Sequence, residues 1–412
     1  MSFRNATHRG VSARPASPYC QDTVDRARLT YRGARLYLIS GGRRNLNKVL
    51  ITGATGQIGS ALAACFLARK VAVVAVSRND PDGERTELAI RGAAAGFGLA
   101  PAALPGGQLE LVNVDFSDLE HCLPAALLDG VTHAWHCCAE MSSSPARLGA
   151  AFDVNVGAST ALFALLGRRS GALRRFYHLS SAYVAGTRGG AAAERLPGAG
   201  RLDDPHLVTK WAAEHALHLQ HTVSAVPLTI VRPTLVVGHR ASGWTGRSGA
   251  GLYMYADALR ALRAAGHASL TVGLDPAVRP DLVTIDQLAD EALALTLDAG
   301  AGARAPFEVF HCGGGGGPTT AELLGAMARA CGVALGFGTP LGALALQFAQ
   351  ATAPAARYAN TEWQFARGGL DRVLGRAAPA PLTPGQWRRL VEAYLGQHAE
   401  PGAPASGAGG AP

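Results

Sequence analysis

A histidine and a lysine stand four residues apart in the stretch "DDPHLVTKWAAEH", residues 203–215. Residues i and i+4 lie on one face of a helix, so His206 and Lys210 would point at the same site. An imidazole has an ordinary pKa of about 6.5 and can transfer protons near neutrality. A neighbouring lysine opposes the imidazolium and lowers that pKa. The pair therefore predicts proton transfer by a neutral histidine.

Three glycines with regular spacing form a candidate phosphate-binding turn. The segment "TGATGQIG", residues 52–59, places Gly53, Gly56 and Gly59 between an apolar strand and a helix. The first glycine allows a tight turn, the second lets the backbone approach a pyrophosphate, and the third permits close packing of helix on strand. The start of the helix supplies amide donors. We expect a dinucleotide to bind here.

The end of the next strand, "VVAVSRND", carries the features that separate NADP from NAD. An acidic residue at this position would normally bind the ribose 2′-hydroxyl of NAD. Ser77 and Arg78 stand there instead, and an arginine suits a 2′-phosphate. Asp80 and Asp82 follow two and four residues later. The pattern favours NADP(H) as cofactor.

Strands and helices alternate along most of the chain. β-rich runs such as "LELVNVDF", "THAWHCCA", "RFYHLSSAYV" and "LTIVRPTLVV" are separated by alanine- and leucine-rich stretches. This alternation predicts an α/β Rossmann fold with a doubly wound parallel sheet. A smaller C-terminal substrate-binding lobe would be built from segments near 187–205, 239–281 and 312–395. The capping-box spacing of Thr319 and Glu322 predicts a helix that begins near residue 320.

The expected domain organisation has four parts. Residues 1–46 would be a basic, disordered extension and 47–240 the NADP-binding Rossmann domain. Residues 241–398 would form mainly the substrate lobe, with some segments returning to the Rossmann core, and 399–412 would be a disordered tail.

The net charge of +8 belongs almost entirely to the extension. Residues 1–46 carry a net charge of +7, whereas the remaining chain has 29 basic and 28 acidic residues. Basic character confined to a tail argues against a nucleic-acid surface. Seven cysteines without framework spacing favour a reducing compartment, so we expect a cytoplasmic protein.

Residues 330–356 contain no charge and are long enough to span a bilayer. Glycines, prolines, glutamines and threonines interrupt the stretch, and strongly apolar side chains are sparse. We therefore expect a buried helix or the wall of an apolar pocket, and no stable membrane insertion.

From about residue 48 to residue 395 the chain resembles the extended short-chain dehydrogenases/reductases. The resemblance rests on "TGATGQIG", "VDFSD", "HCCA" (136–139), "VNVGAS", "HLSSAYVAG" and "VRPTLVVG" (231–238). It implies that the cofactor is bound by Gly53, Thr55, Gly56, Gln57, Ile58, Gly59, Ser77, Arg78, Asp115, Phe116, Ala139, Lys210 and Pro233.

The family's chemistry uses a serine that polarises a carbonyl, a tyrosine that transfers a proton, and a lysine that binds the nicotinamide ribose. The resemblance implies Ser181, Lys210 and the helical Asn155 as catalytic residues, with His206 in the tyrosine's place. No tyrosine in the chain has a lysine four residues later. We expect His206 to be a weak acid that offers one N–H to a carbonyl. The alternative is that His206 faces solvent on its helix because the protein has lost its catalytic activity.

Two further groups of residues are assigned structural roles. Tyr183 shares a strand face with Ser181 and could donate a proton, but packing is the preferred interpretation. His215, His218 and His221 are spread around their helix, so we expect no metal site.

The segments "SSAYVAG", "TKWAAE", "GWTG" and "GLDRVLG" look closest to thioester and fatty-acyl reductases. We therefore predict an NADP(H)-dependent oxidoreductase that reduces the carbonyl of an apolar or biosynthetic small molecule. One alternative is a nucleotide-sugar epimerase or dehydratase, or another biosynthetic enzyme without net redox. A second is a catalytically silent NADP-binding sensor or scaffold. The family often pairs the lysine helix with its mate, so a homodimer is a further expectation.

Overall fold

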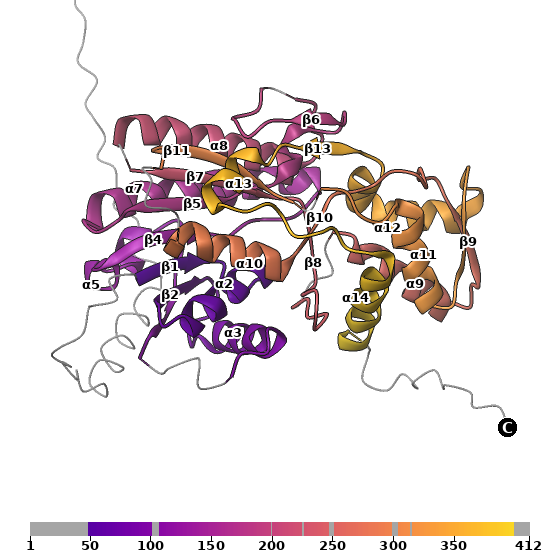
Figure 1. Cartoon of the computed structure of the whole chain (residues 1–412), viewed down its shortest axis with the longest axis horizontal. Helices are drawn as coiled ribbons and strands as arrows, with labels where there is room; N and C mark the ends of the chain where they lie inside the picture. The colour runs from indigo at the N-terminus through magenta and orange to yellow at the C-terminus, as the bar shows by residue number, and fades with distance from the viewer. Residues whose placement is uncertain are drawn as a thin grey trace, which may run out of the picture.

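The computed structural model describes residues 48–100, 107–198, 200–224, 226–246, 251–298, 304–313 and 315–398. The predicted N-terminal extension (1–46) and C-terminal tail (399–412) lie outside the described residues. Figure 1 shows an α/β body that contains the large sheet, and a smaller helical lobe at its right.

The central sheet has seven strands in the order β11-β7-β5-β4-β1-β2-β3, all parallel. This confirms the predicted doubly wound fold. The order reverses between β1 and β4, where such sheets place their ligands beyond the carboxyl ends of the strands. The strands are β1 (Lys48–Thr52), β2 (Ala72–Ser77), β3 (Leu109–Asn113), β4 (Val131–His136), β5 (Arg175–Leu179), β7 (Leu228–Pro233) and β11 (Phe307–Cys312).

Helices cover both faces of this sheet. One apolar layer joins the sheet to α2 (Gln57–Ala68), α3 (Glu84–Gly96) and α10 (Ile285–Leu293). The other joins it to α4 (Leu119–Cys122), α5 (Ala125–Leu128), α7 (Ser159–Arg169) and α8 (Pro205–Ser224). The strands are buried on both faces, as their runs of valine, isoleucine and leucine predict.

A third apolar cluster lies in the C-terminal lobe. It joins α9 (Tyr253–Ala264), α11 (Thr320–Ala330), α12 (Gly342–Ala359) and α14 (Pro384–Gln397) to the short parallel pair β9 (Ser269–Val272) and β12 (Ala334–Phe337). The capping box on Thr319 and Glu322 starts α11 at Thr320, as predicted.

Two more strand pairs connect the lobe and the body. β8 (Leu235–Val237) pairs with β10 (Leu282–Thr284), and β6 (Gly190–Ala192) pairs with β13 (Trp363–Phe365). The remaining elements are short: η2 (Pro145–Arg147), α6 (Leu148–Phe152), η3 (Asp153–Ala158), η4 (Ala182–Ala185), η5 (Ala294–Asp298) and α13 (Gly368–Leu374).

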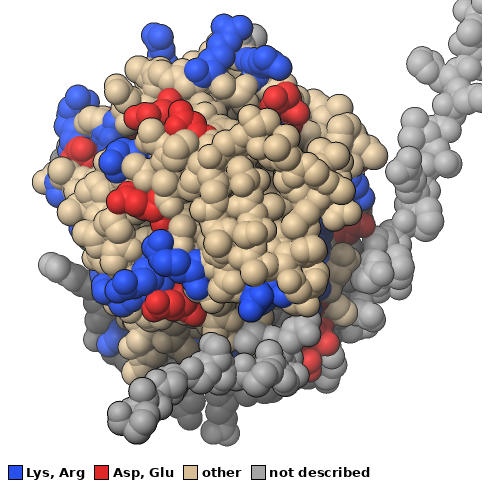
Figure 2. Space-filling model, turned by 90° about the vertical axis from the view of Figure 1, so that its right-hand side faces the viewer, with Lys and Arg blue, Asp and Glu red and all other residues tan. Residues whose placement is uncertain are grey.

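The uncharged stretch 330–356 forms two elements, β12 and the first part of α12. Ala345, Phe348 and Ala355 of α12 are buried in the lobe. Figure 2 views this end of the molecule, where uncharged side chains cover much of the surface. Within the described residues, one helical stretch, Pro145–Arg169, is long and apolar enough to cross a membrane, and 44% of its apolar window is buried. Length and composition alone are weak support for a span.

Three aromatic residues of the segment 244–255, Trp244, Tyr253 and Tyr255, pack within the protein. Trp244 packs against Phe97 of α3, with ring centroids 5.8 Å apart. Tyr253 stacks on Tyr394 of α14 at 4.2 Å, and Tyr255 is also buried in the lobe. The aromatic segment therefore gives no support for an apolar substrate.

Candidate active site

The turn between β1 and α2 has the shape that a pyrophosphate requires. Gly53 has a φ of 69°, and a Cβ there would lie 2.9 Å from the backbone of Cys137 and Cys138. A Cβ on Gly59 would lie 2.4 Å from the Gly53 carbonyl oxygen. No side chain caps α2, whose N-cap is Gly56. Thr55, Gln57 and Ile58 complete the turn, so a dinucleotide phosphate fits against free amide groups.

The acidic residue nearest to the end of β2 is used within the protein. The buried Asp80 carboxylate accepts hydrogen bonds from the backbone N–H groups of Arg85 and Thr86 and from the Thr86 hydroxyl. Ser77 donates to the same carboxylate at 3.4 Å. Arg78 is exposed, and its side chain forms no hydrogen bond or ion pair with the described residues. Asp80 is therefore engaged away from a cofactor ribose, whereas Arg78 is available.

The other predicted cofactor residues follow the carboxyl ends of neighbouring strands. Asp115 lies after β3, where its carboxylate accepts from the backbone and hydroxyl of Ser117. The Phe116 ring meets His136 edge-on, with centroids 6.3 Å apart. Ala139 follows β4, and Pro233 ends β7. The sheet thus brings these residues to the same edge as the glycine turn.

Ser181 lies just beyond β5, and its hydroxyl accepts from the backbone N–H of Tyr183 at 3.3 Å. The chain turns into the 3-10 helix η4 at this point, so Tyr183 is not on a strand and the predicted shared face is wrong. The Tyr183 hydroxyl is buried without a partner, and its ring packs against Tyr358 and Phe365. These contacts support a packing role.

Lys210 is buried beneath the strand that leads to Ser181. Its Nζ donates to the Leu179 carbonyl oxygen at 2.6 Å, two residues before Ser181. Burial lowers the pKa of Lys210 to about 8, while the Cys138 and Cys137 thiols oppose that shift. The ammonium therefore remains mostly charged at neutral pH, close to the predicted serine.

His206 lies at the start of α8 and is only 7% exposed, so the solvent-facing alternative is wrong. Its Nδ1 lies 3.1 Å from the backbone carbonyl oxygen of Glu140. Since a carbonyl only accepts, Nδ1 carries the hydrogen. Burial and the Lys210 charge lower the pKa of His206 to about 4, so the ring is neutral at pH 7. Its Nε2 is then a proton acceptor, opposite to the donor predicted from sequence.

Asn155 binds the same backbone group as His206. Its Oδ1 accepts from the Glu140 N–H at 2.7 Å, and its Nδ2 donates to the Glu140 carbonyl at 3.0 Å. Nδ2 also donates to the Thr209 hydroxyl at 2.8 Å. The structure thus brings Asn155 and His206 together at the backbone of Glu140, with Thr209 bound to the Asn155 amide.

Two contributors to this site were missed from sequence. Asp204 caps α8 by accepting from the backbone N–H groups of His206 and Leu207. An acidic residue just before a helix is an N-cap signal that could have identified it. Glu140 contributes its backbone carbonyl to His206, and no side-chain pattern signals that.

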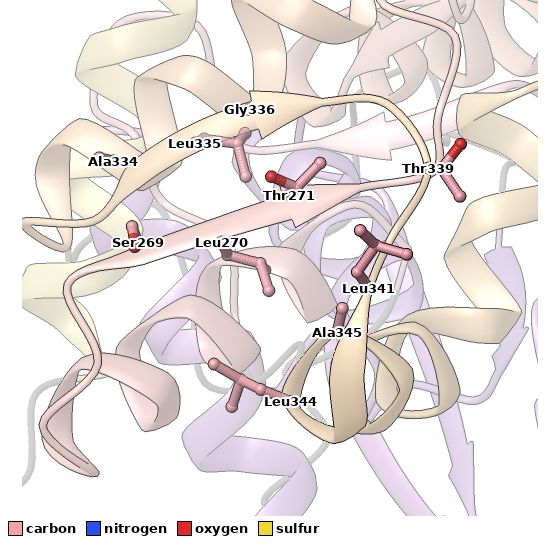
Figure 3. A pocket seen from close by; sticks show the side chains of 10 residues that line it. All are labelled: Ser269, Leu270, Thr271, Ala334, Leu335, Gly336, Thr339, Leu341, Leu344 and Ala345. Atoms are coloured by element: carbon pink, nitrogen blue, oxygen red, sulfur yellow. The ribbon is translucent and has the colours of Figure 1, made fainter.

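Two hollows elsewhere in the molecule have volumes of about 450 and 350 Å³. The larger lies between β9, β12 and the first turn of α12, as Figure 3 shows. The smaller is lined by residues of β6 and β13 and the residues that follow each strand. Neither is lined by Ser181, His206 or Lys210, so the proton-transfer residues do not open into either hollow.

A glycine turn on a doubly wound sheet, followed by a partly buried serine and a buried lysine, is typical of an extended short-chain dehydrogenase/reductase. Residues 49–303 match the model of the NAD dependent epimerase/dehydratase family. This match covers more than half of the chain, so the protein belongs to that family. Membership implies a nicotinamide dinucleotide cofactor, which the glycine turn fits. No curated protein matches the chain significantly.

Solved structures with the same fold include several nucleotide-sugar epimerases. UDP-glucuronic acid 4-epimerase from Bacillus cereus, in complex with NAD, has 19% identity and a TM-score of 0.60, covering 86% of this chain and 100% of its own. UDP-glucose 4-epimerase from Bifidobacterium longum, in complex with NAD+ and UDP, has 16% identity and a TM-score of 0.64, covering 85% and 99%.

The predicted carbonyl reductase of the thioester or fatty-acyl type is wrong. The matching family is that of epimerases and dehydratases, and the similar structures are nucleotide-sugar epimerases. The site gives a physical reason. Carbonyl reduction needs a proton donor at the substrate oxygen, whereas His206 already donates its single N–H to Glu140.

Proposed function

We propose that the protein binds NADP(H) and converts a nucleotide sugar by epimerisation or dehydration, beginning with oxidation of a sugar hydroxyl. Family membership and the similarity of the fold to nucleotide-sugar 4-epimerases support this class of reaction. The observation that carries the proposal is the contact between His206 Nδ1 and the Glu140 carbonyl oxygen, at 3.1 Å. A neutral imidazole whose Nδ1–H is held by Glu140 offers a lone pair on Nε2 to a hydroxyl proton.

In the proposed oxidation, the substrate O–H bond breaks and its proton passes to His206 Nε2. A nicotinamide dinucleotide held at the glycine turn would supply the hydride acceptor for the same carbon, which would become a ketone. The Ser181 hydroxyl donates a hydrogen bond to the substrate oxygen, and the Lys210 charge stabilises the negative charge that develops on that oxygen. Return of the hydride to the opposite face of that carbon, together with return of the proton from His206 to the oxygen, would complete an epimerisation, so no net redox change would occur.

We assign the cofactor as NADP(H), although the similar structures named above contain NAD. Arg78 is exposed at the end of β2 and forms no ion pair among the described residues, although its charge helps to lower the pKa of Glu140. A guanidinium binds a 2′-phosphate through charge-assisted hydrogen bonds. The Arg78 charge also opposes the rise in the pKa of the Cys138 thiol, which places it close to the strand ends that face the cofactor.

The direct test incubates the purified full chain with catalytic NADP+ or NAD+ and, separately, UDP-glucose, UDP-glucuronic acid and UDP-N-acetylglucosamine. Proton NMR would follow the anomeric signals. We expect at least one substrate to give a new sugar signal, and His206→Phe to lower its rate at least 100-fold. The control is His121→Phe, because His121 is 72% exposed. Tight cofactor binding with no conversion of any nucleotide sugar would reject this function.

A catalytically silent dinucleotide-binding protein is the second candidate. It is favoured by the absence of the family's tyrosine and by the pKa of about 4, which makes His206 a weak base. This candidate predicts that the protein binds NADP(H) while His206→Phe changes neither binding nor any turnover. Proton NMR of the nucleotide sugars separates it from the enzyme, because a silent protein gives no new sugar signal.

We also propose that the protein forms a homodimer through α6 and α8. Leu148 and Phe152 of α6 are 40% and 38% exposed, and Leu219 and Val223 of α8 are 68% and 84% exposed. α6 and α8 contact each other, so these side chains can contribute to one apolar face. Sedimentation should show a dimer that Leu219→Glu with Val223→Glu converts to monomer.

A further inference from the structure

Asn155 is fully buried in the π-helical turn η3, and its amide group has a defined orientation. The Thr209 hydroxyl donates to the Pro205 carbonyl at 2.7 Å. A hydroxyl has one hydrogen, so toward Asn155 it must accept, and the nearby amide atom is Nδ2. The Glu140 N–H can only donate, which independently places Oδ1 beside it.

With this orientation, both hydrogens of the Asn155 amide are in use. One goes to the Glu140 carbonyl and the other to Thr209. No donor remains for a substrate, although the resemblance implied a catalytic asparagine. The amide instead forms hydrogen bonds with both the N–H and the carbonyl of Glu140, and these fix the position of that residue's backbone.

The Glu140 carbonyl receives two hydrogen bonds, one from Asn155 Nδ2 and one from His206 Nδ1. A carbonyl oxygen has two lone pairs, so these donors satisfy it completely. The hydrogen bond made by one ring nitrogen decides the state of the other. A fixed carbonyl at Nδ1 therefore keeps the hydrogen there and leaves Nε2 as the acceptor.

We propose that Asn155 is a positioning residue, which acts through the backbone of Glu140 to hold His206 in the Nδ1–H form with Nε2 free to accept a proton. The use of Nε2 as a base rests on the proposed function. Thr209 holds the same amide from α8, so the helix that carries His206 and the turn that carries Asn155 are fixed against each other.

The test reads the hydrogen on His206 directly. In protein labelled with 15N at histidine, long-range proton–nitrogen NMR distinguishes Nδ1–H from Nε2–H, and His206→Phe identifies the signal by its loss. We expect Nδ1–H in the native protein. In Asn155→Leu, at least a third of His206 should change to Nε2–H. Thr209→Val, which removes one partner of Asn155, should give a smaller change, and Thr209→Ser should restore the native signal.

The control is Asn360→Ala, because Asn360 accepts from the backbone of an exposed turn at Asp275. Nε2–H in the native protein would overturn the proposal. An unchanged His206 signal in Asn155→Leu would also overturn it. If Asn155→Leu does not fold, an unchanged His206 signal in Thr209→Val would overturn the proposal instead.

These spectra need no substrate, which separates the two proposals. A tautomer change in Asn155→Leu without nucleotide-sugar turnover by the native protein rejects the function and retains the positioning role. Turnover by the native protein that survives in Asn155→Leu, with an unchanged tautomer, rejects the positioning role alone.

Discussion

Arg357 Nη1 lies 2.9 Å from Oδ2 of Asp204, an ion pair that joins α12 of the lobe to the N-cap of α8. Asp204 is 1% exposed and its other oxygen caps the helix that carries His206. The lobe thus contributes a charge directly behind the proton-transfer residue. This contact links C-terminal residues to the chemistry of the sheet.

Removing this arginine should destabilise the protein. Arg357→Ala would leave the buried Asp204 carboxylate without its cation, and breaking a buried pair in this way costs about 3–5 kcal/mol. Urea unfolding would measure the change. The control is Arg376→Ala, which breaks an exposed pair with Asp290 and should cost less than about 1 kcal/mol. Equal losses for both variants would contradict the structural role of Arg357.

A methyl group at Gly59 should abolish dinucleotide binding. Its Cβ would lie 2.4 Å from the Gly53 carbonyl, so the phosphate turn must move away from α2. Gly92, in the middle of α3, has no atom within 4 Å of the equivalent Cβ. Gly92→Ala should bind cofactor normally and gain about 0.5–1 kcal/mol of stability. Calorimetric titration with NADPH checks both, and binding by Gly59→Ala would contradict the assigned site.

Arg78→Ala should weaken NADPH binding and leave NADH binding nearly unchanged. Loss of a hydrogen bond to a charged group, worth about 1.5–3 kcal/mol, corresponds to roughly 10- to 150-fold in affinity. Arg91→Ala is the control, since Arg91 is paired with Glu87 on the exposed side of α3. An equal effect on both dinucleotides would reject the role of Arg78 in cofactor choice.

Tyr183→Phe should retain full turnover. The hydroxyl is buried without a partner, and burial raises the pKa of Tyr183, so it is poorly suited to releasing a proton. Removing an unsatisfied hydroxyl should also stabilise the protein, by about 1 kcal/mol. Initial rates and thermal unfolding would be measured together. A rate loss of tenfold or more would transfer the proton-transfer role from His206 to Tyr183.

Stability should fall as the pH drops from about 6.5 towards 4. Burial lowers the pKa of His206, His133 and His311 to about 4 and that of His136 to about 3. In this window the unfolded chain takes up protons that the folded chain does not, so protonation favours unfolding. For each histidine, one pH unit between its pKa in the unfolded chain and its lower pKa in the folded chain costs about 1.4 kcal/mol of stability. Unfolding at pH 7 and 5 measures the loss, and His136→Phe should reduce it.

The sheet and the cofactor turn could be predicted because their signals are local. The spacing of Gly53, Gly56 and Gly59 alone predicts the turn, and the apolar runs of the buried strands predict a parallel sheet. The position of Lys210 on the face of His206 also follows from helical geometry.

The direction of proton transfer could not be predicted, because it depends on a backbone carbonyl 66 residues from His206. Sequence shows which side chain replaces the tyrosine but not which ring nitrogen has a partner. Two other features could not be predicted either. Tyr183 follows a strand-like sequence but lies in a 3-10 turn, and the Asp80 carboxylate is bound by Thr86.

The wide turn η3 has a consequence for insertions and deletions. A π-helical turn holds about one residue more than an α-helical turn, so deleting one residue between Asp153 and Ala158 could restore regular winding. The helical residues on either side of the turn would keep their directions, whereas residues within it, Asn155 among them, would be displaced. Asn155 would then leave Glu140 while α7 kept its apolar contacts. Deleting one residue could thus remove the support of the His206 ring without unfolding the protein.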